Sequence, residues 1–313
     1  MDGLHDLSAQ HGALSHQDAA MRRTLKSAIC CVGVGLHSGR RVNVTLRPAP
    51  TGTGVVFRRT DLGLDIPARF DTVCDTRLCT VVGAGSARVG TVEHLMAALA
   101  ASEVTDIVAE LDGPEVPVLD GSSAPWIFLI DCAGTVALDT PARVIEVLRT
   151  VRVQDGEAFA ELRPGRGAVL DMSLSIEFAA AAIGRQALTL AVHGAVIRHA
   201  LAPARTFTQA HEVEGLRAAG LAQGGSLDNA VVVDGARVLN PGGLRMPDEF
   251  VRHKMLDAVG DLSLAGAALQ GRFVGNCSGH TLNNRVLHAL FADSANWRDV
   301  TPGLWTNAVQ QAA

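Results

Sequence analysis

Histidines and carboxylates recur along one short segment at a spacing suited to metal binding. In residues 248–261 (DEFVRHKMLDAVGD), His253, Asp257 and Asp261 occupy every fourth position. A helix has about 3.6 residues per turn, so these side chains share one helix face while apolar residues occupy the other. Two of them can hold one metal ion. A solvated acidic face is the alternative.

A second histidine–carboxylate pair, Glu93 and His94, lies in residues 91–94 (TVEH). Thr91 is expected to cap a helix here, which would place Glu93 near the positive end of the helix dipole and favour its ionised form. With His253 and Asp257, His94 would complete a ligand set that leaves a position for water, as in catalytic zinc sites. Glu93 could then act on that water. A helix cap beside a surface histidine is the alternative.

His280 follows a glycine in residues 278–280 (SGH). A histidine titrates near neutral pH, so on a flexible loop it could donate a proton to a leaving group. A solvent-exposed loop histidine is the simpler alternative. Residues 205–207 (RTF) and 224–226 (GGS) are turn signals that indicate no chemistry by themselves.

Strands and helices must position these residues. Strands are predicted within 27–56 and at 107–111, 143–152, 158–162, 169–176 and 230–233. Helices are predicted after Thr91 and at 122–132, 210–219 and 248–264, with a linker at 139–141. Antiparallel-looking strands followed by helices in each half favour an α+β protein of two similar layers over a doubly wound parallel sheet.

Composition narrows the classes of function. The 313 residues are 48% hydrophobic and 19% charged, which suits a folded chain of two domains. A net charge of −5 and the absence of Tyr argue against a nucleic-acid partner. Six cysteines without regular spacing indicate a reducing compartment, and residues 1–21 do not resemble a signal peptide. With no apolar run long enough for a transmembrane segment, a cytoplasmic chain is expected, and peripheral membrane contact stays open.

The order and sequence of several segments resemble the UDP-3-O-acyl-N-acetylglucosamine deacetylase family, zinc amidases of lipid A biosynthesis. The similar segments are 33–39 (GVGLHSG), 58–61 (RRTD), 91–95 (TVEHL), 119–122 (LDGS), 205–207, 224–226, 249–257 (EFVRHKMLD) and 278–280. They follow the family's order across residues 22–300. The resemblance therefore covers nearly the whole chain.

The resemblance implies a role for each candidate residue. The implied zinc ligands are His94, His253 and Asp257, a set that does not exclude Fe²⁺. Five further residues would act on the reacting groups: Glu93 as general base, His280 as general acid, Thr206 on the oxyanion, Lys254 at the reacting centre or substrate, and Asp261 behind His280 or the ligands. The implied reaction hydrolyses the N-acetyl group of an acylated UDP-sugar. The chain is expected to be a monomer.

The family fold implied is two α+β domains whose helical layers face one another between outer sheets, each domain with a small insert. The expected parts are a flexible tail (1–21), a first domain (22–140), a second domain (141–300) and a C-terminal tail (301–313). In the second insert, 205–233, a βαβ unit would form an apolar passage for the acyl chain. Candidates near this passage are Leu36, Leu78, Cys79, Phe207, Leu216 and Ser226, with ordinary core or turn packing as the alternative.

Two positions depart from the family pattern. Gln209 stands where relatives often carry an aromatic residue, and Ala222 where one carries Cys. The preferred acyl length therefore stays open. Two other functions compete with the deacetylase: a zinc amidase acting on a different acylated amine, and an idle relative that binds the lipid precursor and regulates flux. All the proposed chemical groups are present, which argues against idleness.

Overall fold

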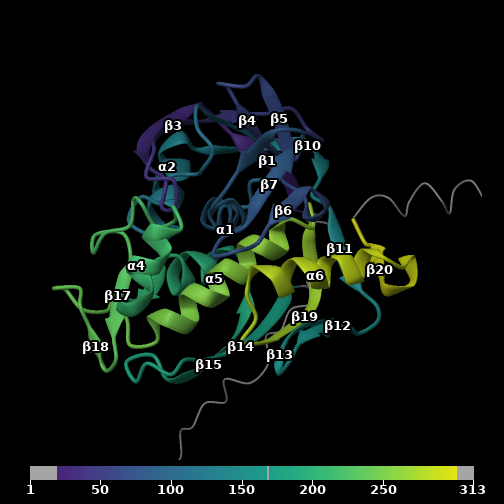
Figure 1. Cartoon of the computed structure of the whole chain (residues 1–313). Helices are drawn as coiled ribbons and strands as arrows, with labels where there is room; N and C mark the ends of the chain where they lie inside the picture. Colours follow the sequence, from purple (N-terminus) through teal and green to yellow (C-terminus); the bar gives the residue numbers. More distant parts are fainter. Residues whose placement is uncertain (1–19, 168, 302–313) are drawn as a thin grey trace, which may run out of the picture.

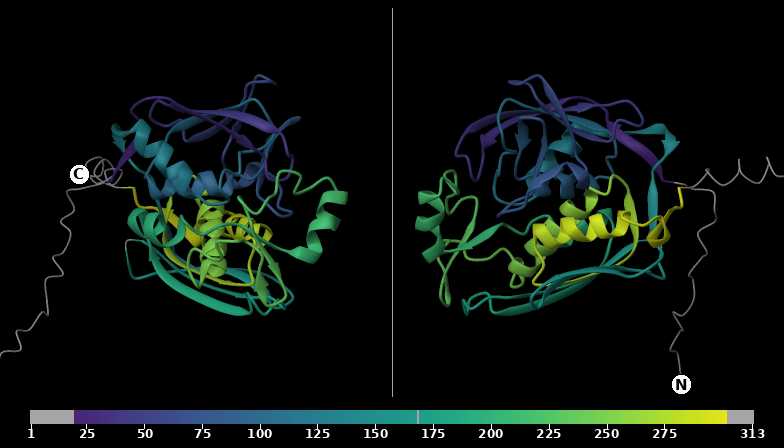
Figure 2. Two further views of the ribbon diagram at one scale, coloured as in Figure 1. Left: turned by 90° about the vertical axis from the view of Figure 1, so that its left-hand side faces the viewer. Right: turned by 45° about the vertical axis from the view of Figure 1, so that its right-hand side comes forward.

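Two outer sheets enclose most of the helices in the computed structural model, which describes residues 20–167 and 169–301 (Figure 1). Figure 2 shows the same layers from two other directions, with helices from both halves of the chain between the sheets. The architecture confirms the expected α+β class. Among the described helices, none has the length and hydropathy needed to cross a membrane.

The first sheet is built from strands that turn apolar side chains inward. Along β3 (Arg41–Pro48), Val42, Val44 and Leu46 are buried and alternate with more exposed residues, because successive side chains point to opposite faces. These residues join α1 (Glu93–Ala101) and α2 (Ala124–Ala133) in one apolar core. The strand order is β2 (Ile29–Val34), β3, β9 (Ile107–Leu111), β4 (Val55–Arg59) and β5 (Leu64–Pro67).

The second sheet centres on β19 (Ala268–Asn276). It pairs antiparallel with β13 (Ala158–Arg163) on one side and parallel with β11 and β14 along successive parts of the other. The remaining strands of this sheet and its helices are β11 (Val144–Val147), β12 (Val151–Asp155), β14 (Leu170–Glu177), β15 (Arg185–Val192), β20 (Trp297–Asp299), α5 (Glu249–Ser263) and α6 (His280–Phe291). Short helical turns are η1 (Phe70–Thr72), α3 (Gly194–Val196), η2 (Ile197–Leu201) and η3 (Ser294–Asn296).

Each half of the chain carries a small additional sheet. The first consists of β6 (Val73–Asp75), β7 (Val81–Ala84) and β8 (Ala87–Val89). In the second, β16 (Phe207–Gln209) pairs parallel with β17 (Val231–Asp234) across α4 (Ala210–Ala218), and β18 (Arg237–Val238) completes the sheet. This segment therefore has the order strand, helix, strand, with its two strands parallel.

The segment that joins the two halves differs from the sequence prediction. Residues 139–141 are not a linker, because they end β10 (Thr135–Pro141), which pairs antiparallel with β1 (Met21–Leu25). Strand β1 also begins at the last residue of the predicted tail, 1–21, whose first nineteen residues lie outside the described part. Of the predicted tail 301–313, Thr301 alone is described.

Two further expectations needed correction. Helix α6 was not predicted, since its Thr and two Asn residues weaken the helical signal. Several strand pairs, including β4–β9 and β14–β19, are parallel although the strands suggested antiparallel pairing. Alternation reports which face of a strand is buried and not the direction of its neighbour.

The two helical layers meet where α1 crosses α5. A Cβ atom on Gly260 would lie 2.1 Å from the backbone oxygen of Glu93, so this crossing requires a glycine. The close approach places the first turn of α1 directly against the C-terminal half of α5. Glu93 and His94 thereby come beside the histidine–carboxylate face of α5.

Candidate active site

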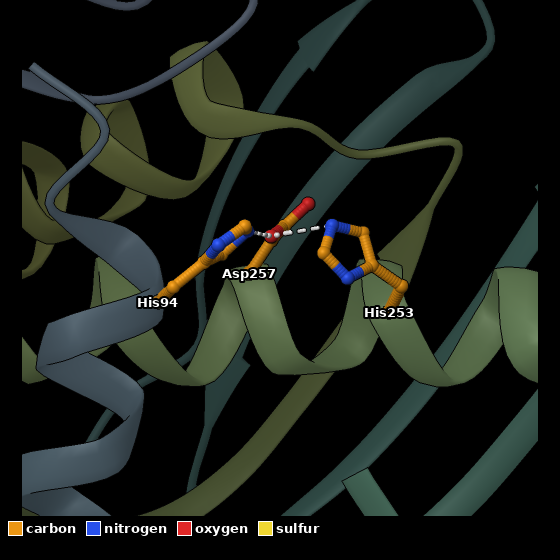
Figure 3. A group of neighbouring side chains, drawn as sticks. All are labelled: His94, His253 and Asp257. Carbon is orange, nitrogen blue, oxygen red and sulfur yellow. Dashed lines mark ion pairs between the residues drawn. The ribbon is translucent and has the colours of Figure 1, made fainter. Parts of the chain in front are cut away.

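Three buried side chains converge at this helix crossing. Figure 3 shows His94 reaching from α1 toward His253 and Asp257 on neighbouring turns of α5. Asp257 Oδ1 lies 3.3 Å from His253 Nε2 and 3.6 Å from His94 Nε2. One donor atom from each residue falls within 4.8 Å of the others, which suits a single metal ion.

The hydrogen bonds around these residues leave their donor atoms free for a cation. Asp257 Oδ2 accepts a hydrogen bond from Lys254 Nζ at 2.8 Å, whereas the buried Oδ1 has no hydrogen-bond partner in the described part of the chain. His253 Nδ1 lies 3.0 Å from the carbonyl oxygen of Ala204. A carbonyl can only accept, so Nδ1 carries the proton and the Nε2 lone pair faces Asp257. Two imidazoles and a carboxylate are a donor set that Zn²⁺ accepts.

The charge states of His253 and Asp257 agree with metal binding. Burial lowers the pKa of His253 to about 4, which keeps that ring neutral. Burial opposes ionisation of Asp257, yet His253 and Lys254 hold its pKa well below the usual range. For His94, burial is outweighed by the Asp257 carboxylate, which raises the pKa of the ring. A proton on His94 therefore competes with a metal ion for the same nitrogen.

A carboxylate and an imidazole, those of Glu93 and His280, lie beside the three ligand candidates. Burial raises the pKa of Glu93, whose Oε1 lies 3.9 Å from His280 Nε2. His280 Nδ1 is 2.9 Å from Asp261 Oδ2, which also accepts a hydrogen bond from Asn283. Burial lowers the pKa of His280, but the carboxylates of Asp261 and Glu93 outweigh it and raise the pKa to about 9.

Two local expectations about this pair were wrong. His280 is not on a flexible loop, because it is the first residue of α6 and is buried between the helical layers. Thr91 does not cap α1, since Val92 occupies that position and the Thr91 hydroxyl donates to Glu115 at 2.9 Å. Glu93 nevertheless begins the helix, as expected.

Thr206, the residue before β16, reaches the same space. It lines a cavity of about 190 Å³ together with Glu93, Lys254 and His280. Its backbone is held on both sides, because its N–H donates to Gly121 and its carbonyl accepts from Val231, each at 2.8 Å. The cavity thus brings a hydroxyl group, an ammonium group, a carboxylate and an imidazole beside the metal candidates.

Comparison with known proteins assigns this arrangement to a family. The family model described as UDP-3-O-acyl N-acetylglycosamine deacetylase matches residues 22–292. The chain belongs to this family. It is therefore a member of a family of deacetylases, which are hydrolases.

Named relatives of this deacetylase family cover nearly the same length. A UDP-3-O-acyl-N-acetylglucosamine deacetylase of Phenylobacterium zucineum (strain HLK1) is 49% identical over 281 residues, 88% of this chain and 95% of the relative. Proteins of the same name from Acidithiobacillus ferrooxidans (strain ATCC 53993 / BNL-5-31) and Idiomarina loihiensis (strain ATCC BAA-735 / DSM 15497 / L2-TR) are 47% and 46% identical. They cover 89% and 90% of this chain and 92% of each relative.

A second cavity of this family member adjoins the first and shares lining residues with it. It measures about 440 Å³, and one of its walls is α4. Five of the six passage candidates line it: Leu36, Leu78, Phe207, Leu216 and Ser226. Cys79 lines neither cavity, because its side chain is buried in the interior. The residue before it, Leu78, has a φ of 67° and is half exposed.

Several residues that hold this deacetylase site were not predicted from the sequence. The fully buried Glu249 accepts hydrogen bonds from the backbone N–H and the guanidinium of Arg205, which precedes Thr206. Asn283 shares Asp261 with His280 and lies three positions after it on α6. A predicted helix at 280–291 would have paired Asn283 with His280, because residues three apart share a helix face. No sequence signal identifies the Ala204 carbonyl.

Proposed function

We propose that the chain removes the N-acetyl group of UDP-3-O-acyl-N-acetylglucosamine by hydrolysis, giving the free amine and acetate, with Zn²⁺ held by His94, His253 and Asp257. The observation that carries the proposal is the free Asp257 Oδ1 facing two imidazole nitrogens beside Glu93 and His280. Zn²⁺ held there would polarise the acetamide carbonyl and lower the pKa of a bound water toward about 7. Fe²⁺ suits the same donors.

Glu93 is the proposed general base. Its burial raises its pKa, so its carboxylate takes up a proton more readily than an exposed glutamate does. Its position next to His94 in the chain places it beside the ligands without making it one. Glu93 Oε1 would accept the proton of the attacking water.

His280 is the proposed general acid. Its raised pKa, about 9, keeps the ring protonated at neutral pH, while Asp261 holds Nδ1 and leaves Nε2 turned toward Glu93. His280 Nε2 would deliver its proton to the departing sugar nitrogen. The Thr206 hydroxyl would donate a hydrogen bond to the developing oxyanion. Lys254, paired with Asp257, would add positive charge at the reacting centre.

The second cavity supports an acyl-chain passage. Its lining is mostly apolar, and it joins the first cavity at Leu36, Leu78 and Phe207. Burying a methylene contributes about 0.8 kcal/mol, so about ten methylenes would contribute about 8 kcal/mol before the costs of binding. A sugar nucleotide with a fatty acyl chain would therefore use both cavities.

Metal analysis combined with an activity assay tests the proposal. We expect about one Zn²⁺ per chain, activity that is lost on chelation and restored by added Zn²⁺, and an inactive Glu93→Gln variant. An acetylated sugar without the uridine diphosphate is the substrate control. Equal turnover of that sugar would indicate an amidase for another amine, and binding without turnover would indicate an idle relative. A fully active metal-free protein would refute the zinc site.

We further propose that the chain works as a cytoplasmic monomer. All six cysteines are free, which supports a reducing compartment. Sedimentation of the purified protein at micromolar concentration tests the oligomeric state. A dimeric mass would contradict the proposal.

A further inference from the structure

Thr80 connects the first small sheet to both members of the acid–base pair. It is almost completely buried and directly precedes β7. Its hydroxyl donates to Asp261 Oδ1 at 2.6 Å, and its backbone N–H donates to Glu93 Oε2 at 3.1 Å. Its carbonyl oxygen accepts from the N–H of Val92, the residue before α1, at 3.3 Å. Every polar group of Thr80 is thus bonded to the elements that carry the site.

The hydrogen bonds of Asp261 give the Thr80 hydroxyl a defined task. Asp261 Oδ2 accepts from His280 Nδ1 and from Asn283 Nδ2, both at 2.9 Å, while Oδ1 accepts from Thr80. Without the hydroxyl, a buried carboxylate oxygen would lose this partner, and only the two hydrogen bonds to Oδ2 would resist rotation of the carboxylate. Rotation would move Oδ2 away from the His280 ring.

We propose that Thr80 is a positioning residue for the deacetylation: its hydroxyl orients Asp261 behind His280, and its N–H orients Glu93. The two contacts fix the position of Glu93 relative to His280, with Glu93 Oε1 3.9 Å from His280 Nε2. The inference rests on the proposed roles of Glu93 and His280. Thr80 lines neither cavity, so it acts on turnover and not on substrate binding.

The turn η1, which leads into the first small sheet and Thr80, is anchored to the opposite helical layer. The Phe70 N–H donates to the Leu264 carbonyl, and the Phe70 carbonyl accepts from Asn284, each at 2.9 Å. The Phe70 ring also stacks on Phe291, with ring centroids 4.7 Å apart. These contacts fix the segment that leads to Thr80 against α5 and α6, so Thr80 can hold Asp261 in place.

A double-mutant cycle tests the proposal on the zinc-loaded enzyme. Thr80→Val keeps the shape of the side chain and removes the hydroxyl, whereas Thr80→Ser keeps the hydroxyl. We expect Thr80→Val to lower kcat about tenfold with KM changed less than about twofold, and Thr80→Ser to stay within about threefold of wild type. In an Asp261→Ala background, Thr80→Val should change kcat less than about twofold, because the side chain it orients is gone.

Controls separate positioning from folding and from the proposed function. Thr24→Val removes the hydroxyl of another buried threonine, on β1, and should lower the thermal midpoint without changing kcat. If Thr80→Val does not fold, Thr80→Ala replaces it in the comparison with Thr80→Ser. Equal losses in the Ser and hydroxyl-free variants, or an unchanged loss of about tenfold in the Asp261→Ala background, would overturn the inference. Full activity of Glu93→Gln and His280→Gln would instead refute the proposed function.

Discussion

Replacing Asp261 by asparagine should move the alkaline limit of catalysis to lower pH. The carboxylates of Asp261 and Glu93 raise the pKa of His280 to about 9, although burial acts in the opposite direction. Asparagine keeps the shape of the side chain and removes its charge. The effect of burial on His280 is then opposed by one carboxylate fewer, so the pKa of His280 should fall toward its ordinary value or below. A general acid works only while protonated, and activity is lost as the pH rises through its pKa.

The size of the effect follows from the two pKa values. A pKa of about 9 leaves about 90% of His280 protonated at pH 8, whereas an ordinary value near 6.5 leaves about 3%. At pH 8, kcat should therefore fall about thirtyfold, and near pH 6 the two enzymes should differ much less.

Steady-state kinetics on the zinc-loaded enzymes, from about pH 5.5 to about pH 10, measure this shift. Asp65→Asn is a matched control, because Asp65 is an exposed aspartate on β5 and pairs with Arg58 far from the acid–base pair. Its alkaline limb should coincide with that of wild type. A uniform loss of kcat in Asp261→Asn with an unmoved alkaline limb would refute the role of Asp261 in raising the pKa of His280.

Three further predictions concern the metal, the helix crossing and the passage. Asp257→Asn should abolish stoichiometric zinc binding, because it removes the charged ligand. Elemental analysis after dialysis measures the bound zinc, and an unchanged far-UV circular dichroism spectrum would show that the fold persists. Gly260→Ala should destabilise the chain by about 3 kcal/mol in denaturant unfolding, since its Cβ would lie 2.1 Å from the Glu93 backbone oxygen; unchanged stability would show that the helices separate freely. Leu216→Glu places a charge in the second cavity and should raise KM about tenfold or more for a long-chain substrate but not for a short-chain analogue; equal effects on both would exclude this cavity as the acyl passage.

The sequence determined the local part of the site. The four-residue spacing of His253, Asp257 and Asp261 places them on one face of any helix that includes them, and α5 contains them all. Alternating apolar residues likewise indicated β3. These features depend on contacts within a turn or a strand, which the residue pattern encodes directly.

Tertiary structure decided which segments meet. His94 joins α5 because Gly260 allows two helix backbones to touch, and His280 is buried because α6 closes over Asp261. Thr80 reaches Asp261 because the first small sheet packs near α5, and no hydrophobic periodicity in the sequence indicates that contact. Local spacing fixes the direction of a side chain along its own element, whereas the distance between elements depends on packing and backbone contacts between residues far apart in the chain. The linker at 139–141 and the cap at Thr91 were wrong for that reason, because strand pairing and a buried hydrogen bond overrode their local signals.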